Sequence, residues 1–535
     1  MMLSATNTSL PSHLPYHLKR KTIAFSLLPK RKPLHLPTPP KPPLKMSSPS
    51  SKISSLLRNQ SDMVSSSPSP DLPLREIPGS YGVPFFGAIK DRWDFFYLQG
   101  IEKFFRSRME NYNSTVYRVN MPPGPWVSDD PRVIVLLDGK SFPILFDTSK
   151  VEKRDVFTGT YMPSTSYTGG FRVCSYLDPS EPMHGSLKSL LFSVIASNHK
   201  EIIPFFQSSL KEMFTALEDE LRDKNKAAFV ALNDSASFQF VFRLFCDGNN
   251  PPETLKSDAP SMLKKWLAGQ LAPINTLGLP KLLNPVEDLF LHSLRVPFFL
   301  VKSDYKKLFD AFSSSATSFL DKAESLGISR EEACHNLMFV GGFNSFGGFS
   351  VFFPSMFKWV ASAGESLHRE LAEEIRTVVK SEGGVTYNAI NKMVLTRSVV
   401  YEALRIEPPV PYQYGKAKDD LVVRSHDGTF KIKKGEMIFG YQPFATNDPK
   451  IFTDPEKFVG NRFVGEGEAL SKYVLWSNGR GIDDPTVENK QCPAKNLVEL
   501  LSTVFLVEFF LRYDTFSVEN GTNLTFLSVK KATST

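Results

Sequence analysis

Apolar positions along the chain recur at two spacings, which predict two kinds of secondary structure. Short runs rich in β-branched residues occur at 114–120 and 131–138, and each has the length and composition of a β-strand. From about residue 182 to residue 404 the spacing is mostly helical, and a last helix is expected at 493–512. Between these two regions, the Asp-Gly pair at 427–428 predicts a β-hairpin. The pattern therefore predicts a mainly α body with a minor β-sheet.

The most apolar stretch runs from about Leu337 to Val360 and contains the sequence GGFNSFGG at 341–348. Ser329 and Glu332 form a capping box that starts this helix, so the glycines fall two to three turns inside it. Each glycine in a helix interior costs about 1 kcal/mol relative to alanine. We therefore expect that the backbone bends there, or that a neighbouring helix or another group approaches it closely. Polar and helix-breaking residues disfavour a membrane span: Asn344, Pro354 and Lys358.

Charge is distributed unevenly along the 535 residues. The formal net charge is +7, but residues 1–61 hold ten basic and no acidic residues, which leaves 7 − 10 = −3 for the remainder. A nucleic-acid-binding role is disfavoured, because the basic excess lies in a terminal arm. Its Ser-, Pro- and Leu-rich composition predicts a chloroplast transit peptide at 1–60, a Ser/Pro-rich linker at 61–71 and a folded body at 72–535.

The four cysteines are far apart and have no paired metal-ligand spacing, so neither a zinc site nor a disulfide framework is expected. Cys492 differs from the others because it stands just before the last predicted helix. A helix N-terminus favours the thiolate form, and a thiolate is a ligand that haem iron accepts. Taken alone, a cysteine in this position is more often an ordinary buried residue.

The order of four features makes Cys492 more informative. After the glycine-containing helix come Glu402 and Arg405, three residues apart, then Arg462 beside an aromatic residue, and then the cysteine. Taken alone, the Glu-Arg pair would be an ordinary surface ion pair of little energetic value. Together and in this order, the features resemble the cytochrome P450 family, from about residue 77 to the C-terminus. The resemblance implies a haem-thiolate fold in which Cys492 binds the iron of haem b.

Two departures from the usual monooxygenase pattern point to one branch of that family. Asn344 and Ser345 stand where an acid and a threonine deliver protons to iron-bound oxygen, and an insertion separates WSNG (476–479) from Cys492. These departures, with strings such as VFTGTYMPST (156–165) and NKQC, resemble the plant enzymes that metabolise fatty-acid hydroperoxides. Within that branch, the chain is most similar to the allene oxide synthase family.

The resemblance implies a hydroperoxide dehydratase, a hydro-lyase of oxylipin and jasmonate biosynthesis. Such an enzyme converts a fatty-acid hydroperoxide to an unstable allene oxide and water without O₂, NADPH or a redox partner. The plastid-type leader favours 13(S)-hydroperoxy-octadecatrienoic acid as the substrate. By the same resemblance, ferric haem on Cys492 cleaves the O–O bond homolytically, Asn344 orients the hydroperoxide and Phe157 assists oxidation of the carbon radical to a cation. Ser345 belongs to the same substrate site. Four basic residues match positions that hold the haem propionates: Lys153, His184, Lys188 and Lys490.

Several alternatives stay open at this point. Phe349 and Ser350 form a lyase-like pair, so a hydroperoxide lyase or divinyl ether synthase is the nearest alternative. A reductase-dependent monooxygenase is disfavoured by Asn344, and a haem-dependent sensor without turnover is disfavoured because Cys492 and Phe157 are both present. The resemblance is also compatible with peripheral membrane association and with functional coupling to a downstream cyclase.

Overall fold

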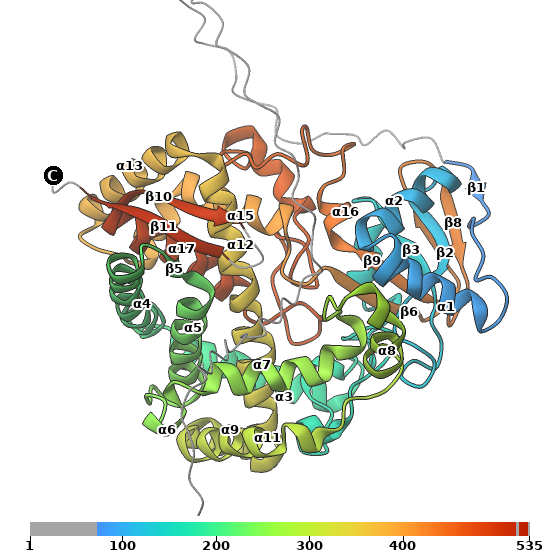
Figure 1. Ribbon diagram of the computed structural model, residues 1–535, viewed down its shortest axis with the longest axis horizontal. Helices are drawn as coiled ribbons and strands as arrows, with labels where there is room; N and C mark the ends of the chain where they lie inside the picture. The colour runs from blue at the N-terminus through green and yellow to red at the C-terminus, as the bar shows by residue number, and fades with distance from the viewer. Residues whose placement is uncertain (1–71, 521–523, 533–535) are drawn as a thin grey trace, which may run out of the picture.

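A computed structural model of the chain describes residues 72–520 and 524–532. The predicted leader at 1–60 and linker at 61–71 lie outside the described residues. Helices form most of the body, and a five-stranded sheet occupies the side opposite α4 and α13 (Figure 1). This arrangement confirms the predicted mainly α body with a minor sheet.

The bounds of the elements follow in chain order. The α-helices are α1 (Phe86–Trp93), α2 (Ile101–Tyr112), α3 (Pro182–Ser197), α4 (Ile202–Lys224), α5 (Phe229–Phe245), α6 (Glu253–Lys256), α7 (Ala259–Leu271), α8 (Asn284–Glu287), α9 (Lys302–Ser315), α10 (Thr317–Ser325), α11 (Arg330–Met338), α12 (Gly347–Ala363), α13 (Glu365–Glu382), α14 (Tyr387–Lys392), α15 (Val394–Ile406), α16 (Gln442–Thr446) and α17 (Lys495–Arg512). The short 3-10 or π segments are η1 (Asp94–Leu98), η2 (Phe142–Phe146), η3 (Thr165–Thr168), η4 (Cys174–Tyr176), η5 (Ala272–Ile274), η6 (Lys281–Leu283), η7 (Asp288–His292), η8 (Phe298–Leu300), η9 (Phe339–Phe346) and η10 (Gly465–Tyr473). The strands are β1 (Leu74–Arg75), β2 (Val116–Asn120), β3 (Arg132–Leu136), β4 (Val151–Glu152), β5 (Ala227–Ala228), β6 (Tyr412–Ala417), β7 (Leu421–Arg424), β8 (Thr429–Ile432), β9 (Met437–Tyr441), β10 (Tyr513–Asn520) and β11 (Leu524–Lys531).

The largest sheet has the strand order β2-β3-β9-β6-β4, and two smaller sheets have the orders β1-β8-β7 and β10-β11-β5. The predicted strands at 114–120 and 131–138 are β2 and β3, which pair antiparallel. The predicted hairpin is β7–β8, where the Ser425 N–H donates to the Gly428 carbonyl at 2.9 Å. The last helix is α17, which begins two residues after the predicted start. The predicted type of secondary structure was therefore correct for each of these segments.

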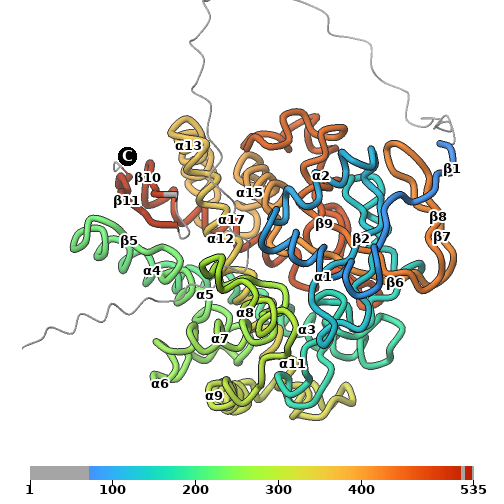
Figure 2. Tube along the Cα trace, turned by 45° about the vertical axis from the view of Figure 1, so that its right-hand side comes forward, coloured from blue at the N-terminus to red at the C-terminus, as the bar shows by residue number. Residues whose placement is uncertain are grey.

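The glycine-rich stretch lies in one continuous helix made of α11, η9 and α12, which runs through the helical part of the body (Figures 1 and 2). Ser329 caps it, because its hydroxyl accepts from the Glu332 N–H at 3.2 Å. By length and composition this helix could cross a membrane, but it packs against α5, α13 and α15 inside the body. It is therefore a core helix, and the sequence-based argument against a membrane span agrees with its place.

The middle of this helix, η9, is π-helical, which the sequence did not predict. Two glycines explain how neighbouring helices approach it. A Cβ on Gly341 would lie 3.3 Å from Val241 Cγ1 of α5, and a Cβ on Gly342 would lie 2.7 Å from Leu263 Cδ2 of α7. The two glycines thus admit neighbouring helices, as one of the sequence-based expectations proposed. Single-turn π segments in helices are frequent at functional sites.

Candidate active site

Phe157 lies against the π-helical segment of the central helix. Its ring centroid is 5.7 Å from that of Phe343 and 5.8 Å from that of Tyr176. Phe339 and Phe343 are four residues apart and stack at 4.7 Å, so together they present one aromatic face to Phe157. The sequence singled out Phe157 and missed its neighbours, although the spacing of Phe339 and Phe343 was readable as one face of a helix.

Asn344 lies in the same π-helical segment, and its side-chain amide makes fewer hydrogen bonds than it can. Its Nδ2 lies 3.5 Å from the hydroxyl of Ser175, which is a long and weak hydrogen bond. Its Oδ1 is buried and accepts no hydrogen bond from the described residues. A buried amide oxygen without a donor is costly, so this side chain is suited to meet a polar ligand. Ser345 follows it and is half-buried.

Four basic side chains gather in a second group and are largely shielded from solvent. Lys153, His184 and Lys188 are 3%, 1% and 2% exposed, and Lys490 is half-buried. In residues 72–520 and 524–532, none of the four forms an ion pair with a carboxylate. The lysines donate instead to neutral oxygens. Lys153 Nζ donates to the Tyr414 carbonyl at 2.6 Å and Lys188 Nζ to the Asn489 carbonyl at 2.6 Å.

Burial disfavours the charged form of each of these basic groups. It lowers the pKa of Lys153 to about 7 and that of Lys188 to about 8. It also lowers the pKa of His184 to about 4, with the charges of Lys490 and Lys188 acting in the same direction. The Nδ1 of His184 is buried and has no hydrogen-bond partner among the described residues. Such a group is suited to bind an anion, because an anion would supply the negatively charged partner that no carboxylate of the described residues provides.

Cys492 lies between the basic group and the start of α17. Its N–H donates to the Ser477 carbonyl at 2.8 Å, and α17 begins three residues later at Lys495. The sequence-based argument that the helix N-terminus favours the thiolate was incomplete, because it left out the effect of burial. Burial raises the pKa of the thiol, while the Ala494 N–H and the Lys188 charge oppose that rise without cancelling it. In the protein alone, desolvation therefore outweighs the helix N-terminus.

One short segment, η4 (Cys174–Tyr176), joins these groups. The Cys174 carbonyl accepts from Lys490 Nζ at 2.9 Å, and the Leu177 carbonyl just beyond accepts from the same nitrogen at 2.6 Å. Ser175 is the neighbour of the Asn344 amide, and Tyr176 is the neighbour of the Phe157 ring. Sequence reasoning gave these residues no role in the site, because their role consists of contacts with residues far away in the chain.

The donor set fits an iron porphyrin. Cys492 offers a sulfur for the metal, and the four basic side chains offer positive charge for the two carboxylates of the porphyrin. The orphaned Nδ1 of His184 and the carbonyl-bound lysines are the observations that support this fit. Asn344 and Phe157 stand apart from these basic residues, and η4 connects the two groups.

Glu402 forms a buried ion cluster near the end of α15. Its carboxylate accepts from Arg405 at 2.7 and 2.8 Å and from Arg462 Nε at 2.9 Å. Glu402 and Arg405 are both 0% exposed. The pair is therefore not a surface ion pair. Because Arg462 belongs to the segment that precedes the cysteine loop, the cluster fastens that segment to α15.

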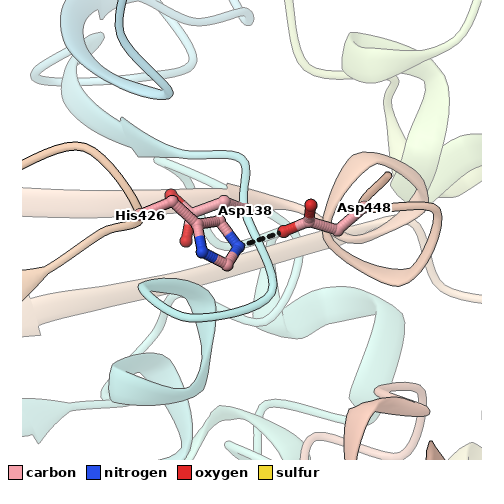
Figure 3. Close-up of side chains that lie close together, drawn as sticks. All are labelled: Asp138, His426 and Asp448. Carbon is pink, nitrogen blue, oxygen red and sulfur yellow. Dashed lines mark hydrogen bonds and ion pairs between the residues drawn. The ribbon is translucent and has the colours of Figure 1, made fainter. Parts of the chain in front are cut away.

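A separate group of Asp138, His426 and Asp448 has a composition that could bind a metal (Figure 3). Its carboxylates are already occupied by hydrogen bonds. Asp448 accepts from His426 Nε2 at 2.7 Å and from the Gly139 N–H at 2.9 Å, and Asp138 accepts from the Ser141 N–H at 2.8 Å. The group fastens the β7–β8 hairpin to the ends of β3 and α16. We assign it a structural role.

Comparisons with known proteins found a matching family model and relatives that cover most of the chain. A family model described as Cytochrome P450 matches residues 365–480, which includes the Glu402 cluster and ends before Cys492. Allene oxide synthase 3 of Solanum lycopersicum is 52% identical over 471 residues, covering 87% of this chain and 96% of that protein. The chloroplastic allene oxide synthase of Arabidopsis thaliana is 54% identical over 472 residues, covering 87% of this chain and 90% of that protein. The 9-divinyl ether synthase of Capsicum annuum is 49% identical over 480 residues, covering 88% of this chain and 100% of that protein.

Proposed function

Because the chain belongs to the allene oxide synthase family, within the cytochromes P450, we propose that it dehydrates a fatty-acid hydroperoxide to an allene oxide. The observation that carries the proposal is the pairing of Asn344, with its unsatisfied buried amide, and Phe157 against the same π-helical segment. The hydroperoxide contains the O–O bond and both oxidising equivalents, so the reaction requires neither O₂ nor a redox partner.

The basic group and Cys492 would hold haem b. Cys492 supplies the sulfur ligand, and Lys153, His184, Lys188 and Lys490 face the propionates. When bound, the haem would supply the one-electron chemistry that cleaves a peroxide O–O bond. The remaining tasks fall to side chains of the protein, which bind the hydroperoxide, orient it and exclude water.

Asn344 orients the hydroperoxide group. A neutral amide donates a hydrogen bond from Nδ2 and accepts one at Oδ1, and it does not give up a proton at ordinary pH. It therefore positions the two peroxide oxygens without promoting heterolysis. The acid that ordinary cytochrome P450 monooxygenases carry at this position would instead deliver protons. Its present neighbour, the Ser175 hydroxyl at 3.5 Å, is a weak partner that the substrate can replace.

Phe157 acts after the O–O bond has divided and the substrate has closed to an epoxide with an adjacent carbon radical. The face of an aromatic ring attracts positive charge. A ring beside that carbon would favour loss of one electron from the radical to give a cation, for which bound haem would be the electron acceptor. Loss of a proton from the cation gives the allene oxide. Tyr176 and Phe343 hold the Phe157 ring on two sides.

We further propose that the substrate is 13(S)-hydroperoxy-octadecatrienoic acid and that the enzyme works in the chloroplast, in jasmonate biosynthesis. Several relatives are named chloroplastic, including the one from Arabidopsis thaliana. The composition of residues 1–60 supports the same compartment. Because an allene oxide decomposes quickly in water, functional coupling to a downstream cyclase belongs to this proposal.

One observation favours a second candidate, a hydroperoxide lyase or divinyl ether synthase. Phe349 and Ser350, five and six residues after Asn344, form the lyase-like pair that the sequence resemblance identified. The similarity to a 9-divinyl ether synthase at 49% identity keeps this candidate in view. The three activities share substrate and cofactor, so the products separate them.

The proposal is tested by incubating the purified full chain with the 13- or the 9-hydroperoxide of octadecatrienoic acid. The incubation is done under nitrogen and without reductant. We expect rapid loss of the conjugated diene with the 13-isomer and slower loss with the 9-isomer. Consumption that depends on NADPH and a reductase would instead indicate a monooxygenase. Equal rates with both isomers would refute the preference for the 13-isomer and leave the dehydratase activity standing.

A further inference from the structure

Gln270, near the end of α7, has a buried side-chain amide whose hydrogen bonds are incomplete. The residue is 2% exposed, and its Oε1 accepts no hydrogen bond from any group in the described part of the chain. Its Nε2 donates to the carbonyl of Trp266, one turn earlier in the same helix, over a long 3.3 Å. A buried amide oxygen without a donor is costly, and native structures contain few such groups. An amide of this kind is suited to meet a polar group of a ligand.

The face of α7 that carries Gln270 packs against the central helix. Trp266 and Leu267 are four and three residues before Gln270, so all three side chains share one face of α7. The Trp266 ring lies 6.3 Å from that of Phe343. Leu267 Cδ1 is the atom that a Cβ on Gly347 would meet first, at 3.5 Å. Gln270 therefore continues a row of side chains that follows the π-helical segment and the start of α12.

Gln270 is also joined to the segment that carries Phe157. The Tyr161 hydroxyl donates to the Gln270 backbone carbonyl at 3.0 Å, and Tyr161 is 5% exposed. One turn earlier, the Trp266 indole N–H donates to the Tyr167 carbonyl at 3.0 Å. Phe157 precedes Tyr161 by four residues and packs against the central helix. The end of α7 is thus fastened to both elements that supply the candidate active site.

We propose that Gln270 binds the carboxyl group of the fatty-acid hydroperoxide, an inference that rests on the proposed function. A fatty-acid hydroperoxide has two polar groups, and each has at most one O–H. The elements around Phe157 offer two buried amide oxygens without a donor, one on Asn344 and one on Gln270. The hydroperoxide O–H satisfies the first, as already proposed, and the carboxyl O–H satisfies the second.

A side-chain amide and a protonated carboxyl group are complementary. Oε1 of Gln270 accepts from the carboxyl O–H, and Nε2 donates to the carboxyl carbonyl in place of its long bond to Trp266. Removal from water raises the pKa of a carboxyl group, so a neutral partner such as Gln270 receives the neutral acid. With the hydroperoxide at Asn344 and the carboxyl group at Gln270, the two ends of the reacting chain are both held.

The test measures binding of two unreactive analogues to the haem-loaded full chain. Both carry a hydroxyl in place of the 13-hydroperoxide. One has a primary amide in place of the carboxyl group, and the other has a methyl ester. Both are neutral at any working pH, but only the primary amide can donate a hydrogen bond at that end. Equilibrium dialysis gives the dissociation constants.

The variant is Gln270→Met, because methionine keeps the length of the side chain without its amide. The matched control is Gln207→Met on α4, where the Gln207 amide donates to Glu508 at 2.7 Å. The haem absorption spectrum checks that both variants retain the cofactor. The comparison of the two analogues in the parent requires no variant, so it stays informative even if Gln270→Met folds poorly.

We expect the parent and Gln207→Met to bind the amide analogue about tenfold more tightly than the ester, the usual effect of one hydrogen bond. Gln270→Met should lose about tenfold in affinity for the amide analogue and little for the ester, so that it binds the two alike. A parent that binds the two analogues alike would overturn the inference. The same would follow if Gln270→Met kept the amide-to-ester ratio of the parent.

The two proposals fail separately. The analogues contain no O–O bond, so their dissociation constants do not depend on which product the enzyme forms. Products other than those of an allene oxide would refute the proposed dehydratase activity and leave the role of Gln270 standing. Normal turnover of the hydroperoxide with no preference for the amide analogue would refute the role of Gln270 alone.

Discussion

Asn344 directs its amide nitrogen toward the Ser175 hydroxyl at 3.5 Å, while its amide oxygen is buried without a donor. The contact is too long to satisfy either group fully. Because Asn344 belongs to the π-helical segment and Ser175 to η4, the pair links the central helix to the segment that also meets Lys490 and Phe157. A polar ligand that enters between these elements can therefore accept a hydrogen bond from the Asn344 Nδ2 and donate one to the Asn344 Oδ1.

Replacing Asn344 by leucine should lower turnover of the hydroperoxide by about 100- to 1000-fold, the usual loss when one preorganised polar group is removed. Leucine has a similar size, so the helix should be retained. The measurement is steady-state consumption of the hydroperoxide, with the haem spectrum as a check on cofactor content. Ser355→Ala, in the α12 part of the same helix, should change the rate little. Comparable losses in both variants would mean that the helix, and not the amide, was disturbed.

Replacing Phe157 by leucine should change the products more than the rate. Without an aromatic face the carbon radical is less readily oxidised to a cation, so chain cleavage to short aldehydes should compete with allene oxide formation. Product ratios from mass spectrometry test this. Phe171→Leu alters a half-buried phenylalanine outside the Phe157 cluster and serves as the control. An unchanged product ratio in Phe157→Leu would refute the role given to the ring.

Replacing Lys153 by methionine should weaken haem retention by about tenfold to a hundredfold, which corresponds to one charge-assisted hydrogen bond of about 1.5–3 kcal/mol. The rate of haem transfer to a scavenger protein reports this directly. Lys416→Met is the control, because Lys416 is exposed on β6 near the Tyr414 carbonyl that Lys153 binds. Equal rates of haem transfer in the two variants would show that Lys153 does not bind a propionate.

Replacing Glu402 by glutamine should lower the free energy of unfolding by about 3–5 kcal/mol, because Arg405 and Arg462 would keep their charges without a carboxylate. Denaturant unfolding followed by circular dichroism gives the difference. Glu468→Gln, at an exposed position, should have no comparable effect. A small loss at Glu402 would show that backbone carbonyls alone satisfy the two arginines.

Acid should destabilise the protein partly through His335, whose pKa burial lowers to about 4 from an ordinary value near 6.5. The unfolded chain then binds a proton that the folded chain excludes, so stability is full above about pH 6.5 and falls as the pH drops toward 4. The expected loss is about 3 kcal/mol. His335→Gln preserves a partner for the Tyr305 hydroxyl and should flatten the pH dependence of the melting temperature. A slope equal to that of the parent would contradict this.

The sequence was a good guide to elements whose pattern is local and a poor guide to contacts between distant segments. The strands at 114–120 and 131–138 and the Ser329 cap depend on neighbouring residues, and they formed as expected. The π-helical segment at Phe339–Phe346 depends on how closely α5 and α7 approach, which Gly341 and Gly342 allow but do not specify.

The candidate site divides in the same way. Cys492, Asn344 and Phe157 were named from motifs and their order. The segment Cys174–Tyr176 was given no role in the site, because its role consists of contacts with residues far along the chain. Glu402 and Arg405 could not be distinguished from a surface pair until Arg462, sixty residues later, was seen to complete the buried cluster.

The most direct test of the account is product identification after the full chain acts on 13(S)-hydroperoxy-octadecatrienoic acid without reductant. We predict ketols and a cyclopentenone, the compounds that an allene oxide forms in water, as the main products. Short aldehydes or a divinyl ether as the main product would contradict the roles of Asn344 and Phe157 and favour the lyase-like reading of Phe349 and Ser350.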